Sequence, residues 1–145
     1  MNRMRKKEEL KLDDEVAKYT TQEISVLVGM SVSQVHYYDR LGLIPNLRRS
    51  ENGYRVFTEK NLIWMKNLKI FIDSEMPLKD IRQLTDLVVQ GKQATAEKRQ
   101  AIVEHHLKEL EKKQAELKKQ VAFMNGFIKT YQQMEKESDE RWIQF

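Results

Sequence analysis

Hydrophobic positions in the first third of the chain follow a helical spacing in two short runs, which Gly29 separates. This pattern predicts two short amphipathic helices joined by a tight turn. Thr20 and Glu23 have the separation of a capping box at the start of the first helix, and Ser31 and Gln34 repeat it at the second. The expected inward positions are Ile24, Leu27 and Val28 in the first helix and Val32, Val35, Tyr38 and Leu41 in the second, which Gly42 ends.

Two short helices around a tight turn form a helix-turn-helix, the motif whose second helix enters the major groove of DNA. The second helix therefore carries the candidate base-reading side chains, Ser33, Gln34, His36, Tyr37 and Arg40. Tyr38 shares the spacing of Val35 and Leu41, so a core position is the alternative for it.

A β-hairpin is predicted after the second helix. Asn52-Gly53 is a strong hairpin turn signal, and Tyr54-Arg55-Val56-Phe57 follows it as a strand. Neighbouring residues in a strand point to opposite faces, so one of Tyr54 and Arg55 can anchor on the protein while the other reaches out. Three cations, Arg48, Arg49 and Arg55, bracket the turn and could meet phosphates together; ordinary surface arginines are the alternative.

Two further helices are expected after the hairpin. The first runs over residues 58–72 with Thr58 as its N-cap, and the second begins near Pro77 and ends near Val89. Their predicted apolar positions are Leu62, Ile63, Met65, Leu68, Ile70, Phe71 and Ile72 in the first, and Met76, Leu78, Ile81, Leu84 and Leu87 in the second.

The last third of the chain predicts one long helix with a coiled-coil seam. Apolar positions alternate spacings of four and three without a break, and a stripe so narrow needs a partner, most simply a second copy in a two-fold dimer. The seam comprises Val103, Leu107, Leu110, Gln114, Leu117, Val121, Met124, Ile128 and Tyr131. Gln114 interrupts it and is a candidate for fixing register, while the heptads alone leave the relative direction of the two helices open.

Composition narrows the class of protein. The chain has 145 residues, of which 40% are hydrophobic and 33% charged, and this balance suits an elongated helical protein. The net charge of +4 is too small to indicate DNA binding by itself. With no cysteine, disulfides, thiolate metal sites and nucleophilic thiols are excluded. The lack of a long apolar run or an apolar signal core predicts a cytoplasmic protein without a membrane partner.

No enzyme chemistry is expected. The sequence lacks a nucleophile with a nearby base, a phosphate-cradling glycine loop and a metal-binding constellation, so no cofactor or metal is predicted. His105 and His106 are the nitrogen ligands to weigh, but adjacent residues project about 100° apart on a helix and do not converge on one ion. Exposed flank positions of the coil are the preferred interpretation for both.

Residues 19–23, 29–33, 37–39, 41–44 and 49–57 together resemble the winged helix-turn-helix head of MerR-family transcription regulators. The matching runs include Tyr-Thr-Thr-Gln-Glu, Tyr-Tyr-Asp, Leu-Gly-Leu-Ile and Ser-Glu-Asn-Gly-Tyr-Arg-Val-Phe. The resemblance implies a mainly α fold with a small β-hairpin wing and an antiparallel dimer coil. It places Ser33, Gln34, His36, Tyr37 and Tyr38 on the recognition helix, Arg49, Tyr54 and Arg55 on the wing, and Lys66 and Lys79 on a second, helical wing. Solvated surface lysines are the alternative for the last two.

The recognition helix departs from the family pattern at two positions. His36 stands where the family usually has arginine, and Ser33 where lysine or arginine is frequent. Neutral imidazole lacks the fixed charge and forked geometry of a guanidinium. We therefore expect a different operator preference and a larger share of the affinity from the hairpin arginines.

The resemblance also implies a mechanism. A homodimer would bind a pseudo-palindromic promoter spacer in double-stranded DNA, distort it and so control transcription, with RNA polymerase affected indirectly, as activator or repressor. The alternative is a DNA-bending accessory or protein-interaction module that uses the same head.

The chain divides into four predicted parts: a charged tail at 1–18, the DNA-binding head at 19–90, the coil at 91–135 and a C-terminal tail at 136–145. Only about fourteen residues follow Tyr131, too few for a separate ligand domain. Large apolar residues at the terminus suggest that Trp142 and Phe145 dock on the head or a partner. A small-molecule effector pocket formed by Phe123, Phe127, Trp142 and Phe145 is the alternative.

Overall fold

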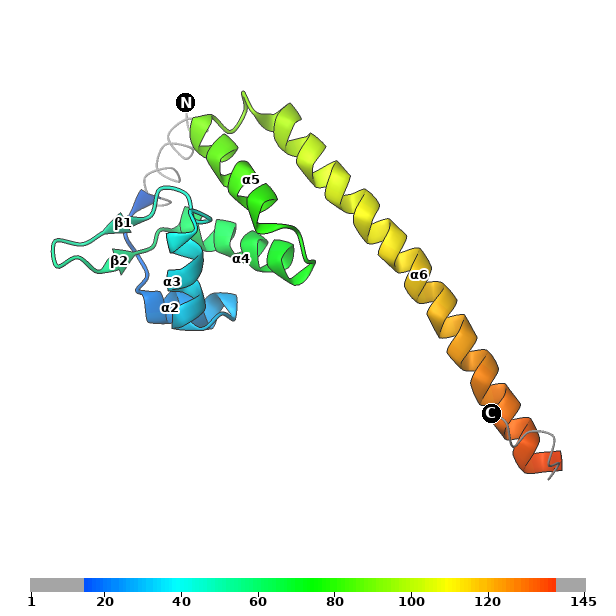
Figure 1. Cartoon of the computed structure of the whole chain (residues 1–145). Helices are drawn as coiled ribbons and strands as arrows, with labels where there is room; N and C mark the ends of the chain where they lie inside the picture. The colour runs from blue at the N-terminus through cyan, green and yellow to red at the C-terminus, as the bar shows by residue number, and fades with distance from the viewer. Residues whose placement is uncertain (1–14, 138–145) are drawn as a thin grey trace, which may run out of the picture. The chain divides into compact units, whose positions relative to one another are not determined.

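The computed structural model describes residues 15–137 and confirms the predicted fold class, a mainly helical protein with a small hairpin and a long C-terminal helix (Figure 1). The described residues divide into two compact units, one that ends at Val103 and one that begins at Glu104. The elements in chain order are α2 (Thr21–Val28), α3 (Val32–Arg40), β1 (Arg48–Arg49), β2 (Arg55–Val56), α4 (Glu59–Asp73), α5 (Leu78–Gln90) and α6 (Ala96–Glu137).

Both predicted capping boxes are present in the helix-turn-helix. The Thr20 hydroxyl accepts from the Glu23 backbone N–H at 3.2 Å, and the Ser31 hydroxyl accepts from the Gln34 N–H at 3.1 Å. Gly29 ends α2 with a φ of 77°, a left-handed conformation that glycine adopts without a Cβ clash. These local signals fix where the recognition helix α3 begins. One predicted inward residue, Leu27, is instead 49% exposed, because the buried stripe of α2 consists of Ile24 and Val28.

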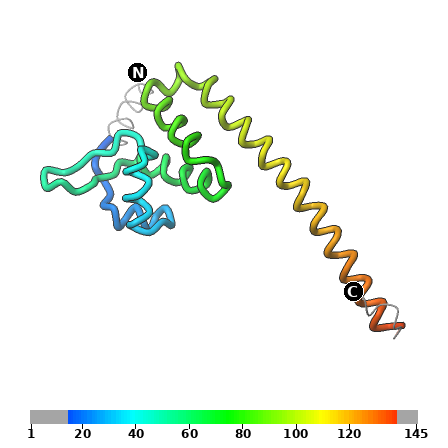
Figure 2. The backbone as a smooth tube through the Cα atoms, in the orientation of Figure 1, coloured from blue at the N-terminus to red at the C-terminus, as the bar shows by residue number. Residues whose placement is uncertain are grey.

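The wing is a two-stranded antiparallel hairpin that projects beyond the helices of the head in the backbone trace (Figure 2). Arg48 pairs with Val56 and Arg49 with Arg55. Within the turn only Gly53 takes a positive φ, of 82°, and its N–H donates to the Ser50 carbonyl at 2.9 Å. The loop is therefore the three-residue type that ends in a left-handed glycine, rather than a turn with two positive φ values.

The hydrophobic core lies between the four helices and the base of the wing. Its fully buried side chains include Ile24, Val35, Phe57, Met65 and Ile81. The sequence pattern overestimated burial in the last two helices of the head: Ile63 and Ile70 of α4 are 54% and 66% exposed, and Leu78 of α5 is 39% exposed. These residues lie on helix faces that no other element in the described part of the head covers.

Asn61 joins the start of α4 to the loop before the wing. It is 4% exposed, its Oδ1 accepts from the Thr58 N–H at 2.9 Å, and its Nδ2 donates to the Pro45 carbonyl at 3.0 Å. Trp64 holds the same loop, because its Nε1 donates to the Leu43 carbonyl at 2.8 Å. Buried polar groups in the loop are thereby satisfied, and the wing leaves the core at a fixed position.

Replacing Asn61 by alanine is expected to lower the free energy of unfolding by about 1–3 kcal/mol, because the Thr58 N–H and the Pro45 carbonyl lose their partner. Urea denaturation measures the change. The matched control is Asn67→Ala on the same helix, where the side chain is exposed and the expected change is within about 0.5 kcal/mol. Equal effects of the two substitutions would contradict the role given to Asn61.

The N-terminal segment joins the sheet earlier than the sequence predicts. Tyr19 forms a bridge with Phe57, and the Lys18 backbone N–H donates to the Phe57 carbonyl at 2.9 Å. The Tyr19 hydroxyl donates to the Glu59 carboxylate at 2.8 Å and, with the Lys18 ammonium 3.4 Å from the same group, lowers the Glu59 pKa below its usual value. Residues 1–14 of the predicted tail lie outside the described residues.

Helix α6 runs uninterrupted over 42 residues. Ile102, near its start, packs against the core of the head. Further along, most seam residues are exposed in the single chain: 51% for Leu107, 59% for Leu117 and 53% for Ile128, while Leu110 is half-buried. The coil seam is therefore an apolar surface that the described residues leave largely exposed.

Candidate nucleic-acid interface

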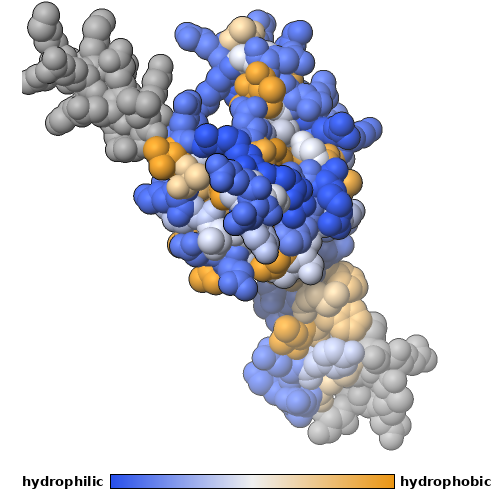
Figure 3. Space-filling view, turned by 90° about the vertical axis from the view of Figure 1, so that its left-hand side faces the viewer, coloured by the Kyte–Doolittle hydropathy of each residue, from blue (hydrophilic) through white to orange (hydrophobic). Residues whose placement is uncertain are grey.

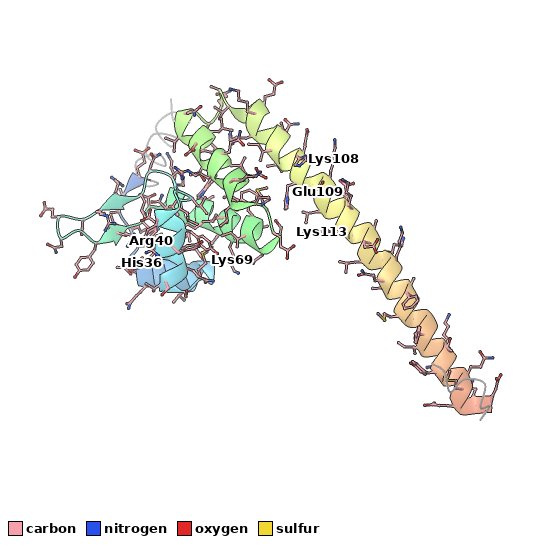
Figure 4. The ribbon with its side chains drawn as sticks, viewed as in Figure 1. His36, Arg40, Lys69, Lys108, Glu109 and Lys113 are labelled. Carbon is pink, nitrogen blue, oxygen red and sulfur yellow. The ribbon has the colours of Figure 1, made fainter. Side chains whose placement is uncertain are left out.

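Helix α3 presents most of the predicted base-reading side chains to solvent. Four of them are exposed: Ser33, Gln34, Tyr37 and Arg40. His36 is half-buried, and it lies with Arg40 on the visible side of α3 in Figure 4. A solvent-facing helix with polar tips of this kind has the form required to enter a major groove.

Two of the predicted recognition residues also make contacts that stabilise the head. The Gln34 side-chain oxygen accepts from the Ser31 backbone N–H at 2.9 Å, so the cap uses this oxygen and the amide NH2 remains as its donor. Tyr38 is half-buried and packs against the hydrophobic core, with its ring centroid 5.4 Å from that of Tyr37. We therefore assign Tyr38 to packing, and Tyr37, 46% exposed, is the aromatic residue that the helix presents.

The wing residue Arg55 is tied to the recognition helix. Its Nε donates to Asp39 Oδ2 at 2.7 Å, and the two side chains are only 15% and 22% exposed. Tyr54, next to it, is 73% exposed. Arg55 therefore lies on the face of the strand that is turned toward the protein. Tyr54 lies on the opposite face, toward solvent.

Arg49 lies directly opposite Arg55 across the hairpin. Its Nη1 donates to the Gly53 carbonyl at 2.8 Å, so the side chain is folded along the turn. Like charges at directly opposite positions of a strand pair repel each other. The Asp39 carboxylate neutralises part of this repulsion, and a bound anion would relieve more.

Several positive charges act on His36 of the recognition helix. Burial lowers this pKa below its ordinary value of 6.5, and the positive charges of Arg55 and Arg40 lower it further, while Asp39 acts in the opposite direction. Arg49 adds a smaller lowering effect. Helix and wing together therefore form one cluster, His36, Arg40, Arg49 and Arg55, here called the cationic cluster.

An NMR titration of the His36 ring is expected to give a pKa below 6.5, and Arg55→Gln should raise that pKa because a nearby positive charge is lost. Since the unfolded chain binds this proton more readily, the group's contribution to stability is present above pH 6.5 and is lost as the pH falls through the folded-state pKa. Arg48→Gln is the control, because Arg48 is not among the groups that shift His36. An unchanged His36 pKa in Arg55→Gln would contradict the cluster.

Further cations flank the helix-turn-helix. The predicted phosphate contacts Lys66 on α4 and Lys79 on α5 are both exposed. Arg82 of α5 lies against Gly42 at the end of α3, where an added Cβ would be 3.6 Å from its Nε. Sequence reasoning missed Arg82, because no local pattern indicates a contact between residues 40 positions apart.

The face of the head that carries the hairpin is mostly hydrophilic in the space-filling view, with apolar residues scattered on it (Figure 3). Such a face, with clustered guanidinium groups and exposed amide, hydroxyl and phenol groups, suits a polyanion with readable edges. Among residues 15–137, no three His, Asp or Glu side chains gather to hold a metal ion. No helix in this part of the chain is long and apolar enough to cross a membrane.

The predicted effector residues are only partly within the described chain. Phe123 and Phe127 lie on α6 with ring centroids 5.3 Å apart, and Phe127 and Tyr131 are 5.6 Å apart. Trp142 and Phe145 lie outside the described residues, so docking and a pocket both stay predictions. Of the two neighbouring histidines on α6, His105 is exposed, whereas His106 is buried, contrary to the expectation of two exposed flank positions.

Comparison with known proteins places this geometry in a family. The family model described as "MerR HTH family regulatory protein" matches residues 19–87, and the one described as "MerR, DNA binding" matches residues 74–127. An uncharacterized HTH-type transcriptional regulator of Haemophilus influenzae is 33% identical over 114 residues, which are 79% of this chain and 84% of that protein. The Bacillus subtilis regulator YyaN is 26% identical over 84% of this chain and 96% of its own length.

Solved structures agree with the sequence relatives. The crystal structure of HiNmlR, described as a MerR family regulator lacking the sensor domain and bound to promoter DNA, is 31% identical, covers 83% of this chain and 95% of its own, and has a TM-score of 0.72. A MerR-family protein of Listeria monocytogenes shares the fold with a TM-score of 0.77 at 23% identity. With its helix-turn-helix, wing and long helix, the chain belongs to the MerR family and is a DNA-binding transcription regulator.

Proposed function

We propose that this protein binds a pseudo-palindromic site in promoter DNA as a homodimer and controls transcription by distorting the spacer between promoter elements. RNA polymerase would then respond to the changed spacer geometry. The cationic cluster supports this proposal, because the ion pair between Arg55 of the wing and Asp39 of α3 brings cations of both elements to one surface. A relative described as bound to promoter DNA and as lacking the sensor domain supports the view that head and coil suffice for binding.

The proposed DNA contacts are assigned to residues by their exposure and charge. Ser33, Gln34, Tyr37 and Arg40 would read base edges from α3, because their side chains are exposed on the helix. Arg49, Arg55 and His36 would meet the phosphates beside that groove. Tyr54 at the wing and the exposed lysines Lys66 and Lys79 would extend the backbone contact on either side.

Distortion of DNA needs contacts at both ends of the bend. Bending a site of 20–30 base pairs costs about 1–6 kcal/mol by elastic estimates, and extra backbone contacts must offset that cost. Two heads, each with a hairpin wing and the cations of α4 and α5, provide such contacts. The exposed seam of α6 supplies the surface that would join the two heads in a dimer.

DNase footprinting on the promoter of its own or a neighbouring gene tests the proposal. The expected result is a two-fold symmetric protected region centred between promoter elements, lost in Arg40→Ala and retained in the control Lys129→Ala, which removes an exposed cation from α6. A circular-permutation gel then measures the bend. Protection without symmetry or outside promoters would instead support the DNA-bending accessory or protein-interaction module.

A further inference from the structure

The side-chain amide of Gln34 is held by the capping box at the start of the recognition helix. Its Oε1 accepts from the Ser31 backbone N–H at 2.9 Å, while the Gln34 backbone N–H donates to the Ser31 hydroxyl at 3.1 Å. A backbone N–H can bond only to an acceptor, so the oxygen of the amide, and not its nitrogen, makes this contact. Gln34 is exposed, and its NH2 group is therefore accessible to a ligand.

The position of Gln34 places this NH2 group where bases are read. Gln34 lies in the first turn of α3, three residues after the N-cap. In helix-turn-helix proteins the N-terminal residues of the second helix contact the base edges. A side chain that is already held in one orientation loses little freedom on binding. In the proposed complex Gln34 thus offers the groove two N–H donors from a preorganised side chain.

We propose that Gln34 selects a keto base, guanine foremost, at one position of each operator half-site. This inference rests on the proposed function and adds a base preference to it. In the major groove guanine presents two acceptors, N7 and O6, and thymine presents the acceptor O4. Cytosine presents an amino donor, and adenine presents an amino donor beside N7. An NH2 group matches the first two bases and meets a like partial charge on the amino groups of the others.

The capping bond reverses the usual preference of a glutamine. A glutamine with its whole amide available reads adenine, because the oxygen accepts from the N6 amino group while the nitrogen donates to N7. That contact would take the Gln34 oxygen away from the Ser31 N–H, which has no partner inside the helix. The same hydrogen bond that begins α3 therefore leaves Gln34 as a donor only.

The charged groups of α3 act in the same direction. The helix contains one carboxylate, that of Asp39, whose Oδ2 accepts from Arg55 Nε at 2.7 Å and whose side chain is 22% exposed. A carboxylate in the groove would select cytosine, but the wing engages this one. Arg40 is exposed and carries donors only. This face of the helix therefore favours base edges that accept hydrogen bonds.

Selection from randomised double-stranded DNA tests the preference. The unaltered full-length protein should enrich a motif with guanine or thymine at one position of each half-site, and titrations should show guanine bound about tenfold better than cytosine there. Gln34→Glu should change the preferred base at this position to cytosine or adenine. Glutamate keeps the capping bond to Ser31 and replaces the NH2 donors by an acceptor oxygen. An unchanged melting temperature would show that the cap is intact.

Two further variants accompany this experiment. Gln34→Ala removes the amide, so the four bases at the selected position should bind within about twofold of one another while preferences elsewhere persist. Gln22→Glu is the matched control, because it makes the same side-chain change at an exposed position of α2. It should leave the preferred base at every position of the motif unchanged.

The outcomes that contradict the inference are distinct. If Gln34→Glu and Gln34→Ala both select the unaltered motif, Gln34 reads no base. If the position that these variants change is adenine for the unaltered protein, the amide oxygen leaves the cap on binding and the donor-only reading is wrong. If the unaltered protein enriches no sequence at all, the proposed binding of a specific operator itself fails.

Discussion

A chain carrying Leu117→Asp is expected to be monomeric and to bind promoter DNA about 10²–10⁴-fold more weakly, because the second head no longer binds intramolecularly. Leu117 is 59% exposed in the single chain, so its replacement removes no core contact of the head. In the proposed dimer it lies near the centre of the seam, where two copies of the new carboxylate would be buried without partners. Light scattering and DNA titration measure the two effects.

Ala115→Asp is the control for that substitution. Residue 115 is exposed on α6 outside the seam, so the new carboxylate stays in water and costs little more than helix propensity. This variant should remain dimeric and bind DNA normally. A Leu117→Asp protein that is still dimeric would show that the exposed seam is not the dimer interface.

The second large effect is expected for Arg55→Ala, which should weaken DNA binding about 10²-fold in the dimer, roughly 1.4 kcal/mol for each half-site. The substitution removes a guanidinium from the cationic cluster and leaves the Asp39 carboxylate unpaired beside the DNA. Loss of one phosphate contact in each protomer should reduce the slope of log affinity against log salt by about 1.8. Titrations of operator DNA at several salt concentrations measure both quantities.

The variant Asp39→Asn distinguishes a phosphate contact by Arg55 from a role of Arg55 in positioning the wing. This variant breaks the 2.7 Å ion pair but keeps the Arg55 charge, so the salt slope should stay near that of the unaltered protein. If Arg55 acts only by holding the wing against α3, Arg55→Ala and Asp39→Asn would weaken binding equally and neither would change the slope. That result would contradict the phosphate contact.

Local features of the head could be predicted from the sequence because neighbouring residues specify them. The capping boxes at Thr20 and Ser31 involve residues three positions apart, and Gly29 ends α2 through its own backbone conformation. The hairpin turn at Gly53 is equally local. These three signals are sufficient to place the recognition helix and the wing along the chain.

The contacts that build the site are not local, and sequence reasoning missed them. Asp39 and Arg55 are 16 residues apart, as are Pro45 and Asn61, and the hydrogen-bond partners are chosen only once the helices have packed. The sequence therefore identified Arg55 as a candidate contact without indicating its carboxylate partner.

Burial was predicted least well on α4. Ile63 and Ile70 extend the apolar pattern of that helix, yet both are more than half exposed. Periodicity reports which residues are apolar, whereas burial depends on whether another element covers that face of the helix. The described residues cover the face with Leu62, Met65 and Leu68 and leave Ile63 and Ile70 largely exposed.

The ion pair between Asp39 and Arg55 ties the wing to the recognition helix and so sets the distance between them in this structure. A duplex can hold α3 in its groove and contact the wing with its backbone at the same time only where the groove wall lies at that distance. Stretches whose groove is too wide or too narrow lose one contact or must deform. In the proposed complex the head would thus respond to groove width, and sites would be selected partly by the stiffness of the DNA.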